Sequence, residues 1–565
     1  MTFLKKIFKK TKLFIIIISI VISSVFGYSF INNDFEISKN IDIFVTLFKQ
    51  LNLFYVDDIN SGELIKTGID AMLKSLDPYT NYIPESELED YKFMTTGQYG
   101  GIGSLIHQRG EYVYISEPYE GFPAQKAGLI AGDKIIEING KSAKGKSSSD
   151  VSSILKGQAG TDVTLLIERE GVDEPIEKEI QRVNVKIDNI PYYGLLDENI
   201  AYIKLTGFTQ NAGKEVKDAF VELSKNNELK GVIIDLRDNG GGLLMEAVNI
   251  VNIFEKKGQF VVSTKSRIKE RNRIHRTLNS PVDLNIPLVI LVNKRSASAS
   301  EIVAGAIQDL DRGVIIGQKT FGKGLVQNIV PLSYNSKLKI TIAKYYVPSG
   351  RCIQAIDYSY NNGNLDRIPD SLKTAFKTKN QRIVYDGGGI EPDIEIDLEN
   401  LSNISYSLLT KYLTFDYANN YKRKHLEIDK AKDFKITDDI YKDFVSFLSD
   451  KNYDYVTQSE KSLEILKKTS KEEKYFSDIE SEFKVLENKM IHNKKDDLNN
   501  FSDEIKRILK SEIVTRYYFK KGRIESSLAD DEAVFKAKEI INDSKTYKAM
   551  LDGSYMNVEK NNNSD

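Results

Sequence analysis

A chain of 565 residues exceeds the size of a single hydrophobic core and predicts roughly three or four domains. Hydrophobic residues (41%) and charged residues (28%) occur in the proportions of a soluble globular protein, and a net charge of -2 argues against nucleic acid as a partner. The one cysteine, Cys352, excludes an internal disulfide and a multi-thiolate zinc site, and the four histidines are scattered, so we expect no metal site.

The N-terminus carries a targeting signal. Lysines up to Lys12 precede an uncharged apolar run from Leu13 to Phe26, which predicts an export or anchoring segment in residues 1–31. The run is shorter than the ~20 residues of a spanning helix, so a cleaved signal and a retained anchor both remain open, with the anchor favoured. We expect the rest of the chain to be exported, anchored in the inner membrane and facing the periplasm or cell envelope.

Two different patterns follow in the first third of the chain. Apolar residues recur at helical spacing through most of residues 32–96, which predicts a helical domain. Short β-branched or alternating runs then fill residues 97–182, with one helix expected from Ser149 to Leu155. This second segment is predicted to be a compact domain of strands and one or two helices.

The remaining chain is predicted to contain an α/β core and a helical domain. Buried-strand runs such as Leu288 to Val292, each followed by a helical pattern, predict an α/β core over residues 183–400. Helical periodicity with many charged residues then predicts a separate helical domain over residues 401–552. The polar tail, residues 553–565, is expected to be disordered.

Three serines, Ser296, Ser298 and Ser300, follow the strand predicted to end near Asn293 and precede a helical pattern. A strand-to-helix turn exposes a side chain above the sheet and directs the amides of the helix N-terminus at it. That geometry suits a nucleophile whose transition state is an oxyanion. Serine is also a favoured N-cap, so the cluster alone favours a capping role.

Two further motifs change that balance. Lys323 stands between two glycines shortly after a predicted strand, and no histidine lies near the serine turn in the sequence. A lysine kept neutral by desolvation is then the candidate base for Ser298, with a plain surface turn as the alternative. The segment Asp235 to Leu243 ends a strand in three glycines, whose amides suit an oxyanion hole, and it lacks the spacing of a phosphate loop.

In this order the motifs resemble those of the C-terminal processing, or tail-specific, proteases, over roughly Asn40 to Asp397. The resemblance implies a multidomain α/β and α+β protein: a crotonase-like protease core, an inserted PDZ domain, an N-terminal helical segment and a C-terminal helical domain. It implies serine endopeptidase activity without a cofactor. The roles it implies are nucleophile for Ser298, general base for Lys323, orientation of the lysine for Gln327, oxyanion amides for Gly242 and Ala299, and structural support for Asp309.

The segment from Tyr99 to Leu105, followed by Pro123 to Gly140, resembles a bacterial PDZ domain. In that arrangement, backbone amides bind a terminal carboxylate and the adjacent strand adds the peptide to its sheet. A glycine turn without a ligand is the alternative. The partners implied are unfolded or tail-bearing proteins held by their C-termini, and the residues implied to bind them are Gly101, Ile102, Gly103 and Ser104.

Two other functions are weighed against the protease. A non-catalytic PDZ scaffold of the cell envelope is disfavoured because Ser298, Lys323 and Gln327 are all present. An acyl-thioester enzyme with a related core is disfavoured by the export signal, the PDZ segment and the lysine motif. Residues 401–552 lie outside the resemblance, and homo-oligomerisation, gating of the site or adaptor binding are the roles considered for them.

Overall fold

The computed structural model describes residues 35–358, 366–397 and 401–555, and the chain divides into two compact units between Tyr82 and Ile83. In the first unit, a helix over residues 35–54 precedes α2 (Ser61–Lys74), whose N-terminal amides bond to the Asn60 side chain. The prediction of helices near the N-terminus is confirmed.

The predicted export or anchoring segment, residues 1–31, lies outside the described residues, as does the tail from residue 556. Within the described ranges, no helix combines the length and apolar composition needed to cross a membrane. The prediction of an anchor in residues 1–31 therefore rests on the sequence alone.

The second unit begins at Ile83, so it includes helix α3 (Leu88–Thr96), which the sequence analysis assigned to the N-terminal domain. After α3, strand β2 (Gln98–Gly101) pairs with β9 (Val183–Lys186) in an antiparallel ribbon. The chain enters the domain formed by residues 102–182 through β2 and leaves it through β9.

Residues 102–182 form an antiparallel sheet with the strand order β3-β4-β5-β7-β8, which leaves β3 at an edge. Helix α5 contacts β3 and packs Val151 and Leu155 into the core of this domain. A capping box between Ser147 and Asp150 begins α5. The elements are β3 (Ser104–Arg109), β4 (Tyr112–Pro118), α4 (Pro123–Lys126), β5 (Lys134–Ile138), β6 (Lys141–Ser142), α5 (Ser148–Leu155), β7 (Asp162–Glu168) and β8 (Ile176–Gln181).

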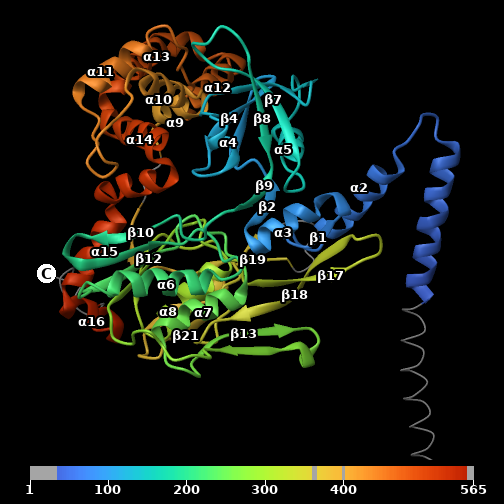
Figure 1. The fold of residues 1–565 in the computed structure, drawn as a ribbon, viewed down its shortest axis with the longest axis vertical. Coiled ribbons are helices and arrows are strands. Elements are labelled where there is room, and N and C mark those ends of the chain that lie inside the picture. The colour runs from blue at the N-terminus through green and yellow to red at the C-terminus, as the bar shows by residue number, and fades with distance from the viewer. Residues whose placement is uncertain (1–34, 359–365, 398–400, 556–565) are drawn as a thin grey trace, which may run out of the picture. The chain divides into compact units, whose positions relative to one another are not determined.

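The α/β core is a mixed sheet with the order β10-β11-β12-β15-β16-β23, parallel except between β10 and β11. Helices α6, α7 and α8 pack on one face, and α15 and α16 on the other (Figure 1). Strand β15 is buried throughout because both faces are covered. The elements are β10 (Tyr192–Leu196), β11 (Ile200–Lys204), α6 (Ala212–Ser224), β12 (Gly231–Asp235), α7 (Leu244–Phe254), β15 (Leu288–Val292), α8 (Ala299–Asp309), β16 (Val314–Gly317) and β23 (Ile394–Glu395).

A further antiparallel sheet, which the sequence pattern did not predict, lies beside this core. Strand β18 pairs with β17 on one side and with β13 on the other, and β13 pairs with β14. These strands are β13 (Phe260–Ser266), β14 (Arg273–Arg276), β17 (Leu325–Pro331) and β18 (Lys337–Tyr346), and two short hairpins follow, β19 (Ile356–Asp357) with β20 (Asp366–Arg367) and β21 (Ala375–Lys377) with β22 (Ile383–Tyr385).

Residues 401–552 are helical, as predicted, but their helices pack in two places. Helices α9, α10, α11 and α13 and the first part of α14 enclose a core of their own, which includes Leu408, Tyr417 and Ile513, and α12 packs against α13. Helix α14 is kinked at Phe519, whose φ of 53° is non-helical. The later helices α15 and α16 pack on the core sheet. The helices are α9 (Asn403–Thr410), α10 (Leu413–Lys424), α11 (Asp438–Phe447), α12 (Gln458–Glu472), α13 (Phe476–Asn500), α14 (Ser502–Ser527), α15 (Glu532–Asn542) and α16 (Ser544–Asp552).

Candidate active site

Ser298 occupies a strained turn between β15 and α8. Its φ of 57° and ψ of -112° lie outside the regions that serine ordinarily adopts. Such strain persists only where surrounding contacts enforce it, and it is common at functional sites. The hydroxyls of the neighbouring serines are both committed: Ser296 donates to Leu236 O at 2.8 Å and Ser300 donates to Asn239 O at 2.9 Å. Of the three serines, Ser298 is the most accessible.

The glycine loop, residues 238–242, lies directly against this turn. The main-chain amide of Ala297 donates to Asn239 O at 3.0 Å. A Cβ at Gly241 would stand 2.8 Å from the Ser298 Cβ and 2.9 Å from the Ala299 nitrogen, a separation that Cβ atoms do not tolerate. The glycine is therefore required by the close approach of the two segments, in addition to its φ of 97°.

Two amides at this junction have no hydrogen-bond acceptor within the described residues. Ala299 is the first residue of α8, so its N–H has no partner within the helix. Among the hydrogen bonds of the described residues, neither the Ala299 amide nor the Gly242 amide is a donor. The structure thus places the two amides that the sequence analysis selected on the two segments that meet at Ser298.

The carboxylate of Glu301 joins the serine turn to the lysine loop, residues 320–324. Its Oε2 accepts from Ser298 N at 2.8 Å and from Lys323 N at 2.9 Å, and its Oε1 accepts from Gly322 N at 2.7 Å and from the Thr320 hydroxyl at 2.5 Å. The main-chain nitrogens of Ser298 and Lys323 therefore lie within two hydrogen-bond lengths of each other. No role was predicted for Glu301 from the sequence, although a Glu three residues after an N-cap serine is the spacing of a capping box.

Burial governs the electrostatics of Glu301. The side chain is fully buried, which raises the pKa of its carboxyl group, while the four hydrogen bonds oppose that rise. The negative charge is held by neutral donors, since each partner is a main-chain amide or a hydroxyl.

Gln327 and Asp309 occupy different surroundings. Gln327 lies on β17, and its side-chain nitrogen donates to Thr341 Oγ1 of β18 at 3.2 Å. Asp309 ends α8, is buried, and forms an ion pair with Arg351 at 2.8 Å while accepting from Ser349 N. Burial raises the pKa of the Asp309 carboxyl, and Arg351 opposes the rise. These contacts support the structural role assigned to Asp309.

The loop from Gly101 to Ser104 lies between β2 and β3. Gly103 has a φ of 75°, and a Cβ there would stand 2.5 Å from the Cβ of Phe122. Among the described hydrogen bonds outside helices and strands, neither the Ile102 amide nor the Gly103 amide is a donor. Edge strand β3 continues from this loop, and α5 runs beside it, so a peptide has both free amides and an open strand edge to bind.

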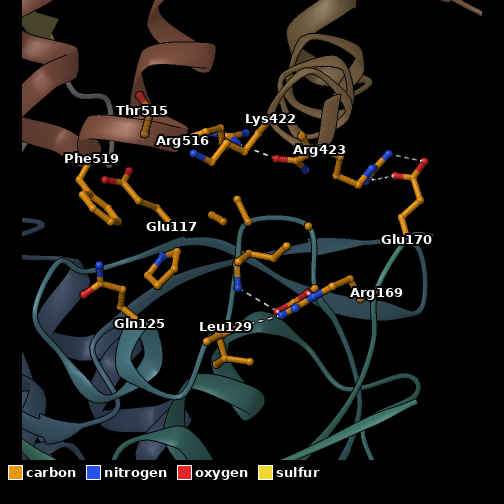
Figure 2. A pocket seen from close by; sticks show the side chains of 18 residues that line it. Glu117, Gln125, Leu129, Arg169, Glu170, Lys422, Arg423, Thr515, Arg516 and Phe519 are labelled. Atoms are coloured by element: carbon orange, nitrogen blue, oxygen red, sulfur yellow. Dashed lines mark hydrogen bonds and ion pairs between the residues drawn. The ribbon is translucent and has the colours of Figure 1, made fainter. Parts of the chain in front are cut away.

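A cavity of about 390 Å³ lies elsewhere, between residues 116–170 and helices α10 and α14. Figure 2 shows Thr515, Arg516 and Phe519 on one side of it and Glu117, Gln125 and Leu129 on the other. None of the catalytic candidates named above lines it. The cavity therefore marks an imperfectly packed interface between two parts of the second unit rather than the site of the serine motif.

Three segments of the chain match known domain families. Residues 199–361 match peptidase family S41, residues 114–169 match a PDZ domain, and residues 404–541 match the C-terminal helical domain of a probable PDZ-protease. These segments fall in the α/β core, the sheet domain of residues 102–182 and the helical region.

Curated relatives carry consistent names. The chain is similar to a carboxy-terminal-processing protease of Bartonella bacilliformis, with 37% identity over 330 residues that cover 58% of this chain and 75% of the relative. It is also similar to the carboxy-terminal processing protease CtpA of Bacillus subtilis, with 28% identity over 429 residues that cover 74% and 89%. Among solved structures, the photosystem II D1 C-terminal processing protease shares 29% identity with a TM-score of 0.34 and covers 63% of this chain and 92% of that one.

Proposed function

The chain belongs to the S41 peptidase family and is a C-terminal processing serine protease with a PDZ domain, and from this premise we propose that Ser298 and Lys323 are its catalytic dyad. The observation that carries the proposal is the shared carboxylate of Glu301, to which both residues donate their main-chain amides. The partly exposed hydroxyl of Ser298, beside a glycine loop and at a helix N-terminus, supports the assignment of the nucleophile.

In the proposed reaction, the neutral amine of Lys323 accepts the Ser298 hydroxyl proton as the oxygen bonds to the peptide carbonyl carbon. The tetrahedral oxyanion accepts hydrogen bonds from the Gly242 and Ala299 amides. Its collapse breaks the C–N bond, and the Lys323 ammonium gives its proton to the leaving amine. Water then adds to the acyl-enzyme while Lys323 takes one of its protons. Collapse of this second tetrahedral intermediate breaks the ester C–O bond, and Lys323 returns the proton to the Ser298 oxygen, which releases the carboxylic acid and restores both residues. In this proposal Gln327 keeps the lysine in position.

Cleavage of an internally quenched peptide tests the dyad. We expect Ser298→Ala and Lys323→Ala to lower kcat/KM by at least about a thousandfold. Lys323→Arg should be equally inactive, because a guanidinium keeps its charge and does not deprotonate in proteins. Ser296→Ala and Ser300→Ala should retain measurable activity, since their hydroxyls bind loop carbonyls. Near wild-type cleavage by folded Ser298→Ala or Lys323→Arg would exclude the dyad.

The PDZ domain is proposed to bind the C-terminus of an unfolded or tail-bearing substrate. The terminal carboxylate would accept from the amides of Ile102, Gly103 and Ser104, with Gly101 setting the approach of the loop, and the peptide would pair with β3. Support comes from the open edge of β3 and from the Ile102 and Gly103 amides, which donate to no other group among the hydrogen bonds described.

The protein is further proposed to act outside the cytoplasm, attached to the inner membrane by residues 1–31. The lysines and the apolar run that ends at Phe26 support this location. The test adds protease to cells with a permeabilised outer barrier. The domains after residue 31 should be digested, and their protection would contradict export.

A further inference from the structure

Arg237 connects the glycine loop to the C-terminal helices. It lies two residues after Asp235, the last residue of β12, and precedes Asp238, the first residue of the loop. On one side, its Nε and Nη2 donate to Asp235, with the shortest contact at 2.6 Å. On the other side, its two terminal nitrogens donate to the two oxygens of Asp531 at 3.0 and 2.7 Å. A bidentate ion pair of this kind fixes the plane of the guanidinium as well as its position.

The position of Asp531 is fixed by its place at the start of α15. Its side chain accepts from Val534 N at 3.2 Å as the N-cap of α15. The first turns of α15 pack Ala533, Val534 and Ala537 against the outer face of the core sheet (Figure 1). Asp531 is therefore placed by the fold independently of Arg237.

Asp531 completes a cluster of charged side chains. In this cluster, formed by Lys204, Asp235, Arg237 and Asp531, the positive and negative charges are equal in number only when Asp531 is counted. Two cations, Lys204 and Arg237, contact the fully buried carboxylate of Asp235, and Lys204 Nζ lies 3.0 Å from it. Both cations are 13% exposed, so an uncompensated charge there is costly. Asp531 supplies the second anion, at 18% exposure.

A displacement of Arg237 would also move the glycine loop that lies beside Ser298. Lys204 Nζ donates to Arg237 O at 3.0 Å, so the same cluster holds the main chain where the glycine loop starts. Two residues later, Asn239 O accepts from Ala297 N and from the Ser300 hydroxyl, which joins the loop to the serine turn. The start of the loop that carries the Gly242 amide is therefore tied to this cluster.

We propose that Asp531 is a positioning residue of the protease site, which fixes Arg237 and, through it, the glycine loop that presents the Gly242 amide. This inference rests on the proposed role of that amide. It assigns the C-terminal helical segment a part in catalysis, through a residue 294 positions away from Arg237 in the sequence.

The test compares variants of the full-length chain on a short internally quenched peptide and on a peptide boronate, which mimics the tetrahedral intermediate. Asp531→Asn and Asp531→Ser retain side chains that cap a helix but lose the charge. We expect kcat to fall about tenfold or more with KM within about twofold, and the boronate Ki to rise by the same factor as kcat falls. Asp531→Glu should restore part of the loss.

Asp530→Asn is the matched control, because Asp530 is 50% exposed and pairs with Lys510 rather than with the core. It should match wild type within about twofold. Unchanged kcat in Asp531→Asn and Asp531→Ser, a loss confined to KM, or an unchanged boronate Ki would overturn the inference. Ser298→Ala, assayed in parallel, separates the two proposals, since its activity reports on the dyad alone.

Discussion

The amides of Ser298 and Lys323 donate to one oxygen of Glu301, and Gly322 and Thr320 donate to the other. At the scale of single residues, this carboxylate therefore sets the spacing of the proposed dyad. A neutral amide of the same shape cannot replace it, because an NH2 group at either position would face two donors. The dyad is thus expected to depend on a residue that never touches the substrate.

We predict that Glu301→Gln lowers kcat/KM by at least about tenfold and destabilises the fold by about 2–4 kcal/mol, as expected for buried donors left without an acceptor. Peptide cleavage and urea unfolding measure the two effects. Glu391→Gln is the control, because Glu391 is 51% exposed and its pair with Lys319 is worth at most about 1 kcal/mol. Equal behaviour of the two variants would show that Glu301 does not organise the site.

The residues that organise the site differ in how far the sequence could reveal them. Glu301 stands at capping-box distance from Ser298, so local spacing held the signal. Asp531 gave no such signal, because its partner Arg237 is 294 residues away and the contact exists only after α15 packs on the sheet. Local chemistry can be predicted from spacing, whereas a long-range ion pair requires the fold.

At the scale of elements, buried strands were the most predictable. The predicted limits of β15 agree with the structure, since it is a compact apolar run. The sheet of β13, β14, β17 and β18 was not predicted, because polar residues interrupt the apolar ones in its strands and most of the residues are only partly buried. The sheet also depends on the pairing of β13 with β18, two strands distant in sequence, and composition does not reveal such a pairing.

The loop before β3 allows a test of peptide binding by this element. We predict that Gly103→Ala abolishes the preference for a free over an amidated C-terminus, because the new Cβ would meet Phe122 and the φ of 75° disfavours alanine. Fluorescence anisotropy with the two peptides measures the preference, which should be at least about tenfold in wild type. Cleavage of a short internal peptide should remain.

Gly110→Ala provides the matched control for that loop. Gly110 also has a positive φ, 61°, but its Cβ would enter open space. It should keep the carboxylate preference, so loss of preference in both variants would attribute the effect to general damage of the domain. Retention in both would contradict binding at Gly103.

At the scale of the whole second unit, the PDZ domain contacts the helical region through charged and aromatic side chains. Arg109 donates to both oxygens of Asp416 at 2.9 Å, and Arg423 pairs with Glu170 at 3.0 Å. The His107 ring stacks on Tyr412 with a centroid separation of 4.4 Å. The cavity in the same interface (Figure 2) indicates incomplete packing, which favours reversible docking of the domain.

We expect His107 to make this docking dependent on pH. Burial, with Arg109 and Arg516 nearby, lowers the pKa of His107 to about 4. A free histidine titrates near 6.5, so the docked state favours the neutral ring, and docking should weaken as pH falls from about 6.5 towards 4. Burial raises the pKa of Asp416, against the effect of Arg109, and this carboxyl opposes the trend.

We predict that the distance between the PDZ domain and the helical region lengthens and broadens between pH 7 and pH 4. Spin labels at the exposed positions Val172 and Leu426, introduced as cysteines in a Cys352→Ser background, report it by electron paramagnetic resonance. His107→Phe keeps an aromatic ring against Tyr412 but cannot titrate, so its distances should stay constant over that range. A wild-type distance that does not change with pH, or a change that persists in His107→Phe, would show that this histidine does not control docking.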